Sequence, residues 1–150
     1  MISSLRILAA SPKSRKILKE KLEAKGYPDT VVQKTLSNLE EKGFLNDRVF
    51  AQGVLQSYSQ YRAAGRKRVA FEMKKRGILP PMIDEVLQQY GPEEEFAKAV
   101  ELVRNKKERW KKLESAKKKK KLYDFLCRRG FDFGMVRDVL DQVMREKDDA

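Results

Sequence analysis

The sequence contains no histidine and only one cysteine, Cys127. Histidine is the commonest general acid–base and metal ligand, so its absence removes most nucleophile pairs and metal sites. A single cysteine excludes an internal disulfide and favours a reducing compartment. The chain also lacks a glycine-rich phosphate loop. We therefore expect a protein that is not an enzyme, with no catalytic residues, no cofactor and no metal.

Long apolar runs are missing too. No stretch approaches the roughly 20 apolar residues that a membrane-spanning helix needs. The first ten residues have no basic stretch followed by a long apolar one, so they make a poor secretion signal. We expect a soluble, cytoplasmic protein with no membrane partner.

The chain has only 8 glycines and 5 prolines among 150 residues, and each proline stands where a helix could begin. Ser11–Pro12 fits a helix N-cap, and Gly26 can end one helix before Asp29 caps the next. Between these positions apolar residues recur at steps of three and four, and no stretch alternates cleanly with a period of two. The pattern predicts an all-α fold.

Two further helices are expected outside these positions. Asn46 or Asp47 can cap a helix that runs to about Arg62. A second helix begins after Gly91–Pro92 and could continue through Trp110 and Leu113.

A repeated pattern surrounds Gly26, Gly77 and Gly130. In each copy, apolar residues stand eight and four positions before the glycine, a basic residue precedes it, and an apolar residue follows it. The apolar residues are Leu18, Leu22 and Tyr27; Val69, Met73 and Ile78; and Leu122, Leu126 and Phe131. Two helices packed at a sharp turn fit this pattern, and three copies predict a tandem array. We expect one domain, elongated, made of three three-helix, helix-turn-helix-like repeats at about 1–45, 46–95 and 96–150.

The net charge of +12 is concentrated in two patches. Residues 104–121 hold eleven basic and two acidic residues, and residues 62–76 hold seven basic residues and one acidic residue. Such clusters can follow a polyanion or an acidic protein surface, although a lysine run is more often a solvated helix face. The candidate binding residues are Arg62, Arg66, Lys67, Arg68, Lys74, Lys75, Arg76, Arg104, Lys106, Lys107, Arg109, Lys111, Lys112, Arg128 and Arg129.

Two kinds of uncharged residue accompany these patches. Gly65 lets the backbone approach a partner closely. Tyr58, Tyr61 and Trp110 could stack on nucleic-acid bases, but aromatic residues at helical spacing belong more often to the core. We therefore favour core positions for all three.

Several motifs resemble those of the RecX regulatory proteins. They are LNDRVFA at 45–51, GRKRV at 65–69 and EMKKRGI at 72–78, with LYDFL at 122–126 and RRGF at 128–131 in the third copy. The resemblance covers almost the entire chain, and its specificity lies in the combination of motifs.

The resemblance implies a modulator of the RecA recombinase, usually an inhibitor, that lodges in the groove of the RecA filament on single-stranded DNA. It also implies suppressed ATP hydrolysis and strand exchange, with roles in DNA repair, in the regulation of recombination and in the SOS response. We expect a monomer. The alternative is a stand-alone nucleic-acid-binding, helix-turn-helix-like protein, in which Gln33, Lys34, Gln88 or Gln89 would reach base edges.

Overall fold

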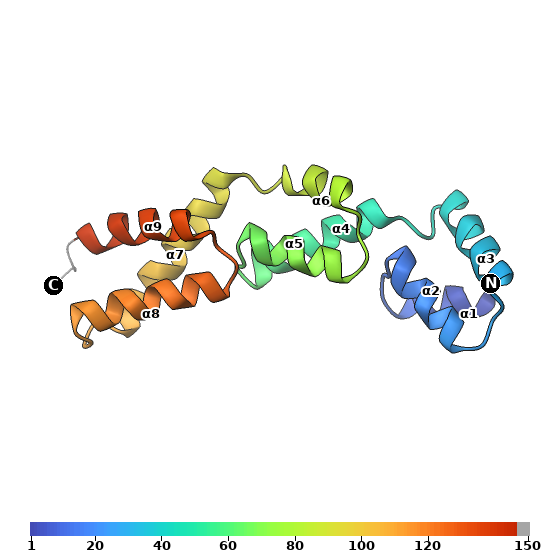
Figure 1. Ribbon diagram of the computed structural model, residues 1–150, viewed down its shortest axis with the longest axis horizontal. Helices are drawn as coiled ribbons and strands as arrows, with labels where there is room; N and C mark the ends of the chain where they lie inside the picture. Colours follow the sequence, from blue (N-terminus) through green and yellow to red (C-terminus); the bar gives the residue numbers. More distant parts are fainter. Residues whose placement is uncertain (147–150) are drawn as a thin grey trace. The chain divides into compact units, whose positions relative to one another are not determined.

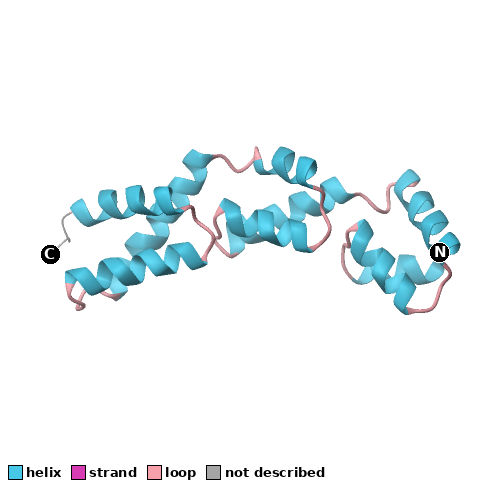
Figure 2. Ribbon diagram, viewed as in Figure 1, coloured by secondary structure: helices cyan, strands magenta, loops and turns pink. Residues whose placement is uncertain are grey.

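The computed structural model describes residues 1–146, and within that range the protein consists of helices with no strands (Figures 1 and 2). The α-helices are α1 (Ile2–Ala10), α2 (Arg15–Ala24), α3 (Asp29–Glu41), α4 (Asp47–Gln56), α5 (Arg66–Lys75), α6 (Pro80–Leu87), α7 (Pro92–Arg109), α8 (Ser115–Arg128) and α9 (Phe133–Arg145). A short π-helix, η1 (Ser57–Tyr61), continues α4. The all-α prediction is confirmed.

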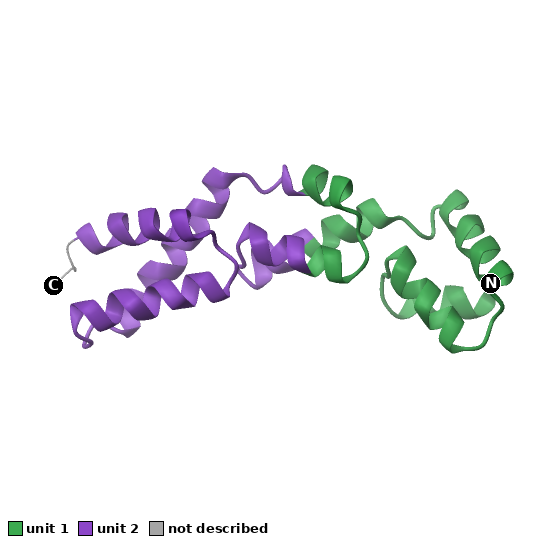
Figure 3. Cartoon of the chain, viewed as in Figure 1, with its two compact units in different colours: residues 1–54, 72–86 green, residues 55–71, 87–150 purple. Residues whose placement is uncertain are grey.

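The chain divides into two compact units (Figure 3). Unit 1 comprises residues 1–54 and 72–86, and unit 2 comprises residues 55–71 and 87–150. The predicted middle repeat contributes helices to both units. The repeat boundaries at 1–45, 46–95 and 96–150 therefore stay a prediction.

Three helix pairs share one turn geometry, as the repeated pattern predicts. The pairs α2–α3, α5–α6 and α8–α9 turn at Gly26, Gly77 and Gly130, whose φ angles are 90°, 86° and 89°. A left-handed φ favours glycine because it has no Cβ. In each turn the residue after the glycine donates its backbone N–H to the carbonyl five positions earlier, at 3.4, 3.0 and 3.2 Å. The repetition of a bent helix pair is confirmed.

Each unit has its own apolar core. In unit 1 one buried cluster consists of Leu18, Leu22, Val32, Leu36, Leu39 and Leu45. A buried cluster of unit 2 includes Val100, Val103, Leu122, Leu126, Phe131, Val136, Val139, Leu140 and Val143. Apart from Tyr27, these sets contain the apolar positions that the first and third copies of the repeat predict. Burying such side chains supplies most of the driving force that holds amphipathic helices together.

One apolar position differs between the copies. Ile78 and Phe131 are buried directly after their glycines, whereas Tyr27 is 41% exposed. The hydroxyl of Tyr27 hydrogen-bonds to that of Ser3 in α1 at 2.9 Å. A tyrosine with a polar contact at the surface is not confined to the core.

The ends of several helices differ from the prediction. Ser14, not Ser11, caps α2 and accepts a hydrogen bond from the backbone N–H of Ile17 at 3.2 Å, and Ser11 instead follows the last residue of α1. Asp29 lies in the first turn of α3, after the N-cap residue Pro28. Asn46 caps α4, as predicted, because its side chain accepts from two backbone N–H groups.

Helix α7 ends at Arg109 and does not continue through Leu113. The ring of Trp110 packs edge-on against Phe125 of α8, with ring centroids 6.4 Å apart. This contact lies where the chain leaves α7 and turns back into α8. None of the helices within residues 1–146 combines the length and the apolar character needed to cross a membrane.

Candidate functional site: an arginine cleft in unit 2

A cleft of about 390 Å³ in unit 2 collects four arginines. They come from the end of η1, the start of α5 and the end of α8. The cleft is lined by Tyr58, Tyr61, Arg62, Ala64, Arg68, Arg128 and Arg129, and we call it the arginine cleft. No carboxylate is among these lining residues, so the cleft is a concave surface of one charge sign. Such a surface attracts anions.

Two uncommon backbone features form the rim of the cleft. The π-helix η1 ends with a hydrogen bond from the N–H of Arg62 to the carbonyl of Ser57 at 3.1 Å, and Ala63 then adopts a φ of 48°. The next residue, Ala64, accepts a hydrogen bond from the buried hydroxyl of Tyr90 at 2.9 Å. Single π-turns and left-handed non-glycine residues cost energy and concentrate at functional sites.

Contacts within the protein hold two of the arginines in position. The guanidinium of Arg62 lies 4.6 Å from the centroid of the Tyr58 ring and donates to the Tyr58 hydroxyl at 3.2 Å. Arg129 donates to the backbone carbonyl of Arg62 at 2.7 Å and lies over the ring of Phe125 at 4.8 Å. The charged groups thus take fixed positions before any ligand arrives, which lowers the entropy cost of binding.

The tyrosines occupy two different environments. Tyr58 is buried, as predicted, whereas Tyr61 is 80% exposed at the edge of the cleft. The core prediction for Tyr61 is therefore wrong. The π-helix adds a residue to the turn and so changes the face on which the following side chains lie. Trp110 is half-buried against the third-repeat core, in keeping with its prediction.

A close backbone contact brings α5 and the α8–α9 turn together at the cleft. The N–H of Gly65 donates to the carbonyl of Arg129 at 2.8 Å, and the N–H of Lys67 donates to that of Gly130 at 3.2 Å. A Cβ on Gly65 would lie 2.5 Å from the carbonyl carbon of Gly130 and 2.6 Å from the nitrogen of Phe131. Gly65 does permit a close approach, but the partner is another segment of its own chain.

Arg66 and Lys67 make contacts inside the protein. The backbone N–H of Arg66 donates to the carboxylate of Glu95 at 3.0 Å, and its Nε is buried with no hydrogen-bond partner among the described residues. Glu95 is 3% exposed, and burial raises its pKa, against the opposing effect of Arg66. Lys67 pairs with Asp132 at 3.1 Å, and the hydrogen bond from Lys67 lowers the pKa of Asp132. Of the three consecutive basic residues, only Arg68 lines the cleft.

Most predicted residues of the connector 104–112 also have partners within unit 2. Arg104 pairs with Glu146 at 2.5 Å, and this contact lowers the pKa of Glu146. Lys106 lies over the rings of Trp110 and Phe125, Lys107 donates to the carbonyls of Val143 and Glu146, and Lys111 pairs with Glu108. Arg109 and Lys112 are exposed. None of these residues lines the arginine cleft.

The remaining predicted residues belong to unit 1. Lys74 and Lys75 are exposed in the last turn of α5, and Arg76 pairs with the buried carboxylate of Glu72. The structure therefore brings together Arg62, Arg68, Arg128 and Arg129 and leaves the other candidates outside the cleft. In the part of the chain that is described, no three histidine, cysteine, aspartate or glutamate side chains form a group that could hold a metal ion.

Known proteins with similar sequences share one description. A family model described as "RecX, first three-helix domain" matches residues 2–44, and one described as "RecX, third three-helix domain" matches residues 93–140. The chain is 34% identical over 142 residues to "Regulatory protein RecX" of Chlorobium phaeobacteroides (strain BS1), covering 95% of this chain and 91% of that protein. It is 32% identical over 143 residues to the protein of that name from Streptomyces coelicolor, covering 95% of this chain and 76% of the relative.

Solved structures show the same fold. The crystal structure of RecX from Lactobacillus salivarius aligns with a TM-score of 0.87 and 18% sequence identity, covering 96% of this chain and 94% of that one. A second structure, titled "Crystal structure of regulatory protein RecX", aligns with a TM-score of 0.81 and 20% identity, covering 91% of this chain and 69% of that one.

Proposed function

Because the chain belongs to the RecX family of regulatory proteins, we propose that it binds RecA recombinase filaments on single-stranded DNA and inhibits ATP hydrolysis and strand exchange. It acts in the cytoplasm, in the regulation of recombination, DNA repair and the SOS response, and it catalyses no reaction itself. A ligand that binds one state of the filament more tightly than another shifts the population toward that state. Inhibition by this route needs no catalytic group.

The arginine cleft is the observation that carries this proposal. Its four arginines, without a carboxylate among the lining residues, suit the phosphates of a nucleic acid backbone. Tyr61, mostly exposed at the edge, can stack on an unpaired base. Phosphate contacts beside an aromatic surface are typical of sites for single strands.

The test reverses two charges in the cleft. In Arg68→Glu/Arg128→Glu both substituted side chains are exposed, which limits the damage to the fold. The concentration of protein that half-inhibits the DNA-dependent ATPase of RecA should rise at least tenfold, because two phosphate contacts are replaced by repulsion. Circular dichroism should report unchanged helix content.

A matched control carries the same change of net charge elsewhere. Lys21→Glu/Lys34→Glu alters two exposed lysines of α2 and α3 in unit 1 and should leave the half-inhibitory concentration within twofold of wild type. Equal effects of the two double variants would mean that net charge matters and the cleft does not. Undiminished inhibition by Arg68→Glu/Arg128→Glu would refute the assignment of the cleft.

The stand-alone nucleic-acid binder makes a different prediction. A mobility-shift assay compares random duplex, bare single strand and RecA-coated single strand. The proposed function requires the tightest binding to the coated strand. Tighter binding to the duplex, with no added effect of RecA, would contradict the proposal and favour the alternative.

A further inference from the structure

The first helix of two pairs is capped by a carboxylate from the helix that follows the pair. In unit 1 the backbone N–H of Arg15 donates to Asp47 at 2.8 Å, and Asp47 lies in the first turn of α4. In unit 2 the N–H of Arg66 donates to Glu95, which lies in the first turn of α7. Arg15 and Arg66 stand at the same position, eleven residues before the glycines of their turns.

Among residues 1–146, no such cap is present in the third pair. Lys119 stands eleven residues before Gly130, and within the described residues no helix follows α9. Helix α8 begins four residues before Lys119, at Ser115. The backbone N–H of Lys119 therefore lies inside the helix, where N–H groups bond to the carbonyl four residues earlier, and only its side chain is available for an anion. A position that receives a carboxylate in the first two pairs receives none in the third from residues 1–146.

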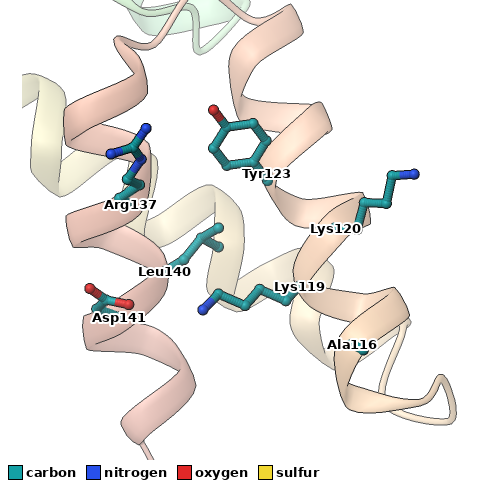
Figure 4. A pocket seen from close by; sticks show the side chains of 7 residues that line it. All are labelled: Ala116, Lys119, Lys120, Tyr123, Arg137, Leu140 and Asp141. Carbon is teal, nitrogen blue, oxygen red and sulfur yellow. The ribbon is translucent and has the colours of Figure 1, made fainter.

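Beside Lys119 lies a groove of about 470 Å³ between α8 and α9 (Figure 4). It is lined by Ala116, Lys119, Lys120, Tyr123, Arg137, Leu140 and Asp141, and we call it the α8–α9 groove. Leu140 is buried at its floor, and Figure 4 shows Lys119 reaching from α8 toward α9, with Tyr123 and Arg137 farther along. The groove therefore combines an apolar floor with three cations and one carboxylate.

In the first pair, the side chain at the position that corresponds to Lys119 is Arg15, and it has partners on α3. There Arg15 donates to Gln33 at 3.1 Å and pairs with Glu40 at 2.8 Å. At the corresponding positions of the third pair, Gln33 is replaced by Arg137 and Glu40 by Met144. Two cations, Lys119 and Arg137, thus flank the α8–α9 groove.

Neither these two cations nor Lys120 has a carboxylate partner within ion-pair distance among the described residues. We propose that the α8–α9 groove binds an acidic, extended segment of a partner protein. Its carboxylates pair with Lys119 and Arg137, and an apolar side chain packs against the half-buried ring of Tyr123.

Two features of the groove favour a peptide over a nucleic acid. Asp141, in the wall of the groove, can accept a backbone N–H of a peptide, whereas a phosphodiester backbone has no donor to offer it. The half-buried ring of Tyr123 offers an apolar contact that a phosphate backbone does not use. The groove also shares no lining residue with the arginine cleft, so the two sites can be tested separately.

Fluorescence anisotropy with the full chain tests this proposal. The probe is a fluorescein-labelled peptide, Asp-Glu-Leu-Glu-Asp, and its uncharged counterpart is Asn-Gln-Leu-Gln-Asn. The acidic peptide should bind at least tenfold more tightly than the uncharged one. Replacing the central leucine of the acidic peptide by glycine should weaken binding severalfold, because the apolar contact is lost.

Variants of the protein locate the binding site. Lys119→Glu/Arg137→Glu should weaken binding of the acidic peptide at least tenfold. The matched control, Lys117→Glu/Arg145→Glu, reverses one lysine of α8 and one arginine of α9 that are exposed and do not line the groove, and should change the Kd less than twofold. Arg68→Glu/Arg128→Glu, in the arginine cleft, should likewise leave the Kd nearly unchanged.

Equal losses of affinity for the acidic peptide in the groove variant and in its control would overturn the proposal, because they would mean that binding depends on net charge and not on the groove. So would displacement of the bound acidic peptide by oligo(dT) at equal total charge, since that would make the groove a general polyanion site. An unchanged Kd in Lys119→Glu/Arg137→Glu would place the peptide elsewhere. None of these measurements uses RecA, so their outcome is independent of the inhibition assay.

Discussion

Replacing Gly65 by alanine should break the backbone contact between α5 and the α8–α9 turn. The added methyl would overlap the carbonyl of Gly130, so the two segments must separate. Two hydrogen bonds depend on this contact, from Gly65 to Arg129 and from Lys67 to Gly130. Each is worth about 0.5–1.5 kcal/mol, and forced overpacking adds about 1–3 kcal/mol. We expect Gly65→Ala to lower the free energy of unfolding by about 2–6 kcal/mol.

Urea denaturation followed by circular dichroism at 222 nm measures this loss. Gly53→Ala is the control, because Gly53 lies within α4 and a methyl there would meet nothing within 4 Å. Alanine is the better helix former by about 0.8–1.0 kcal/mol, so the control should be slightly stabilised. If the free energy of unfolding of Gly65→Ala lay within 1 kcal/mol of the wild-type value, the argument that close backbone packing requires glycine at this position would be refuted.

Two further predictions concern buried hydrogen bonds. Tyr90→Phe removes the donor to Ala64 and should cost about 1–3 kcal/mol. Burial, with smaller effects of Glu95 and Glu94, raises the pKa of Tyr90 in the folded protein. The contribution of the neutral Tyr90 hydroxyl to folding stability is therefore complete below the unfolded pKa of about 10 and is lost as the pH rises above it. Urea titrations from pH 8 to 11 should therefore give a shallower alkaline loss of stability for Tyr90→Phe, and parallel curves would contradict this reasoning. In unit 1, Ser14 caps α2 and donates to the carbonyl of Arg76, so Ser14→Ala should cost about 1–3 kcal/mol. Ser14→Gly should cost about 1 kcal/mol, because glycine keeps most of the cap but cannot donate to Arg76. Equal losses in the two variants, measured by urea denaturation, would mean that the cap contributes little.

Local patterns predicted much of the fold. The glycine turns at 26, 77 and 130 and the apolar positions around them follow from helix periodicity and from the left-handed conformation that glycine allows. Helix ends were less predictable. Ser11–Pro12 has a good cap signature, but Ser14 can bond to both Ile17 and Arg76, and that longer-range contact favours the later start.

The composition of the candidate site was partly visible in the sequence, but its geometry was not. Arg62 and Arg68 belong to a recognisable basic cluster, yet Arg128 and Arg129 join them only because Gly65 meets the α8–α9 turn. No spacing rule predicts a contact between segments more than sixty residues apart. The π-helix, which exposes Tyr61, is equally invisible to a pattern search with a period of 3.6 residues.

The contact between Gly65 and Gly130 also restricts how the protein can evolve. A Cβ on Gly65 would meet backbone atoms of Gly130 and Phe131, and a Cβ on Gly130 would meet backbone atoms of Arg68. Every amino acid has these backbone atoms, so no second substitution can clear space by shrinking a neighbour. A lineage that loses one of these glycines can recover the junction only by reversion or by reshaping the chain around it.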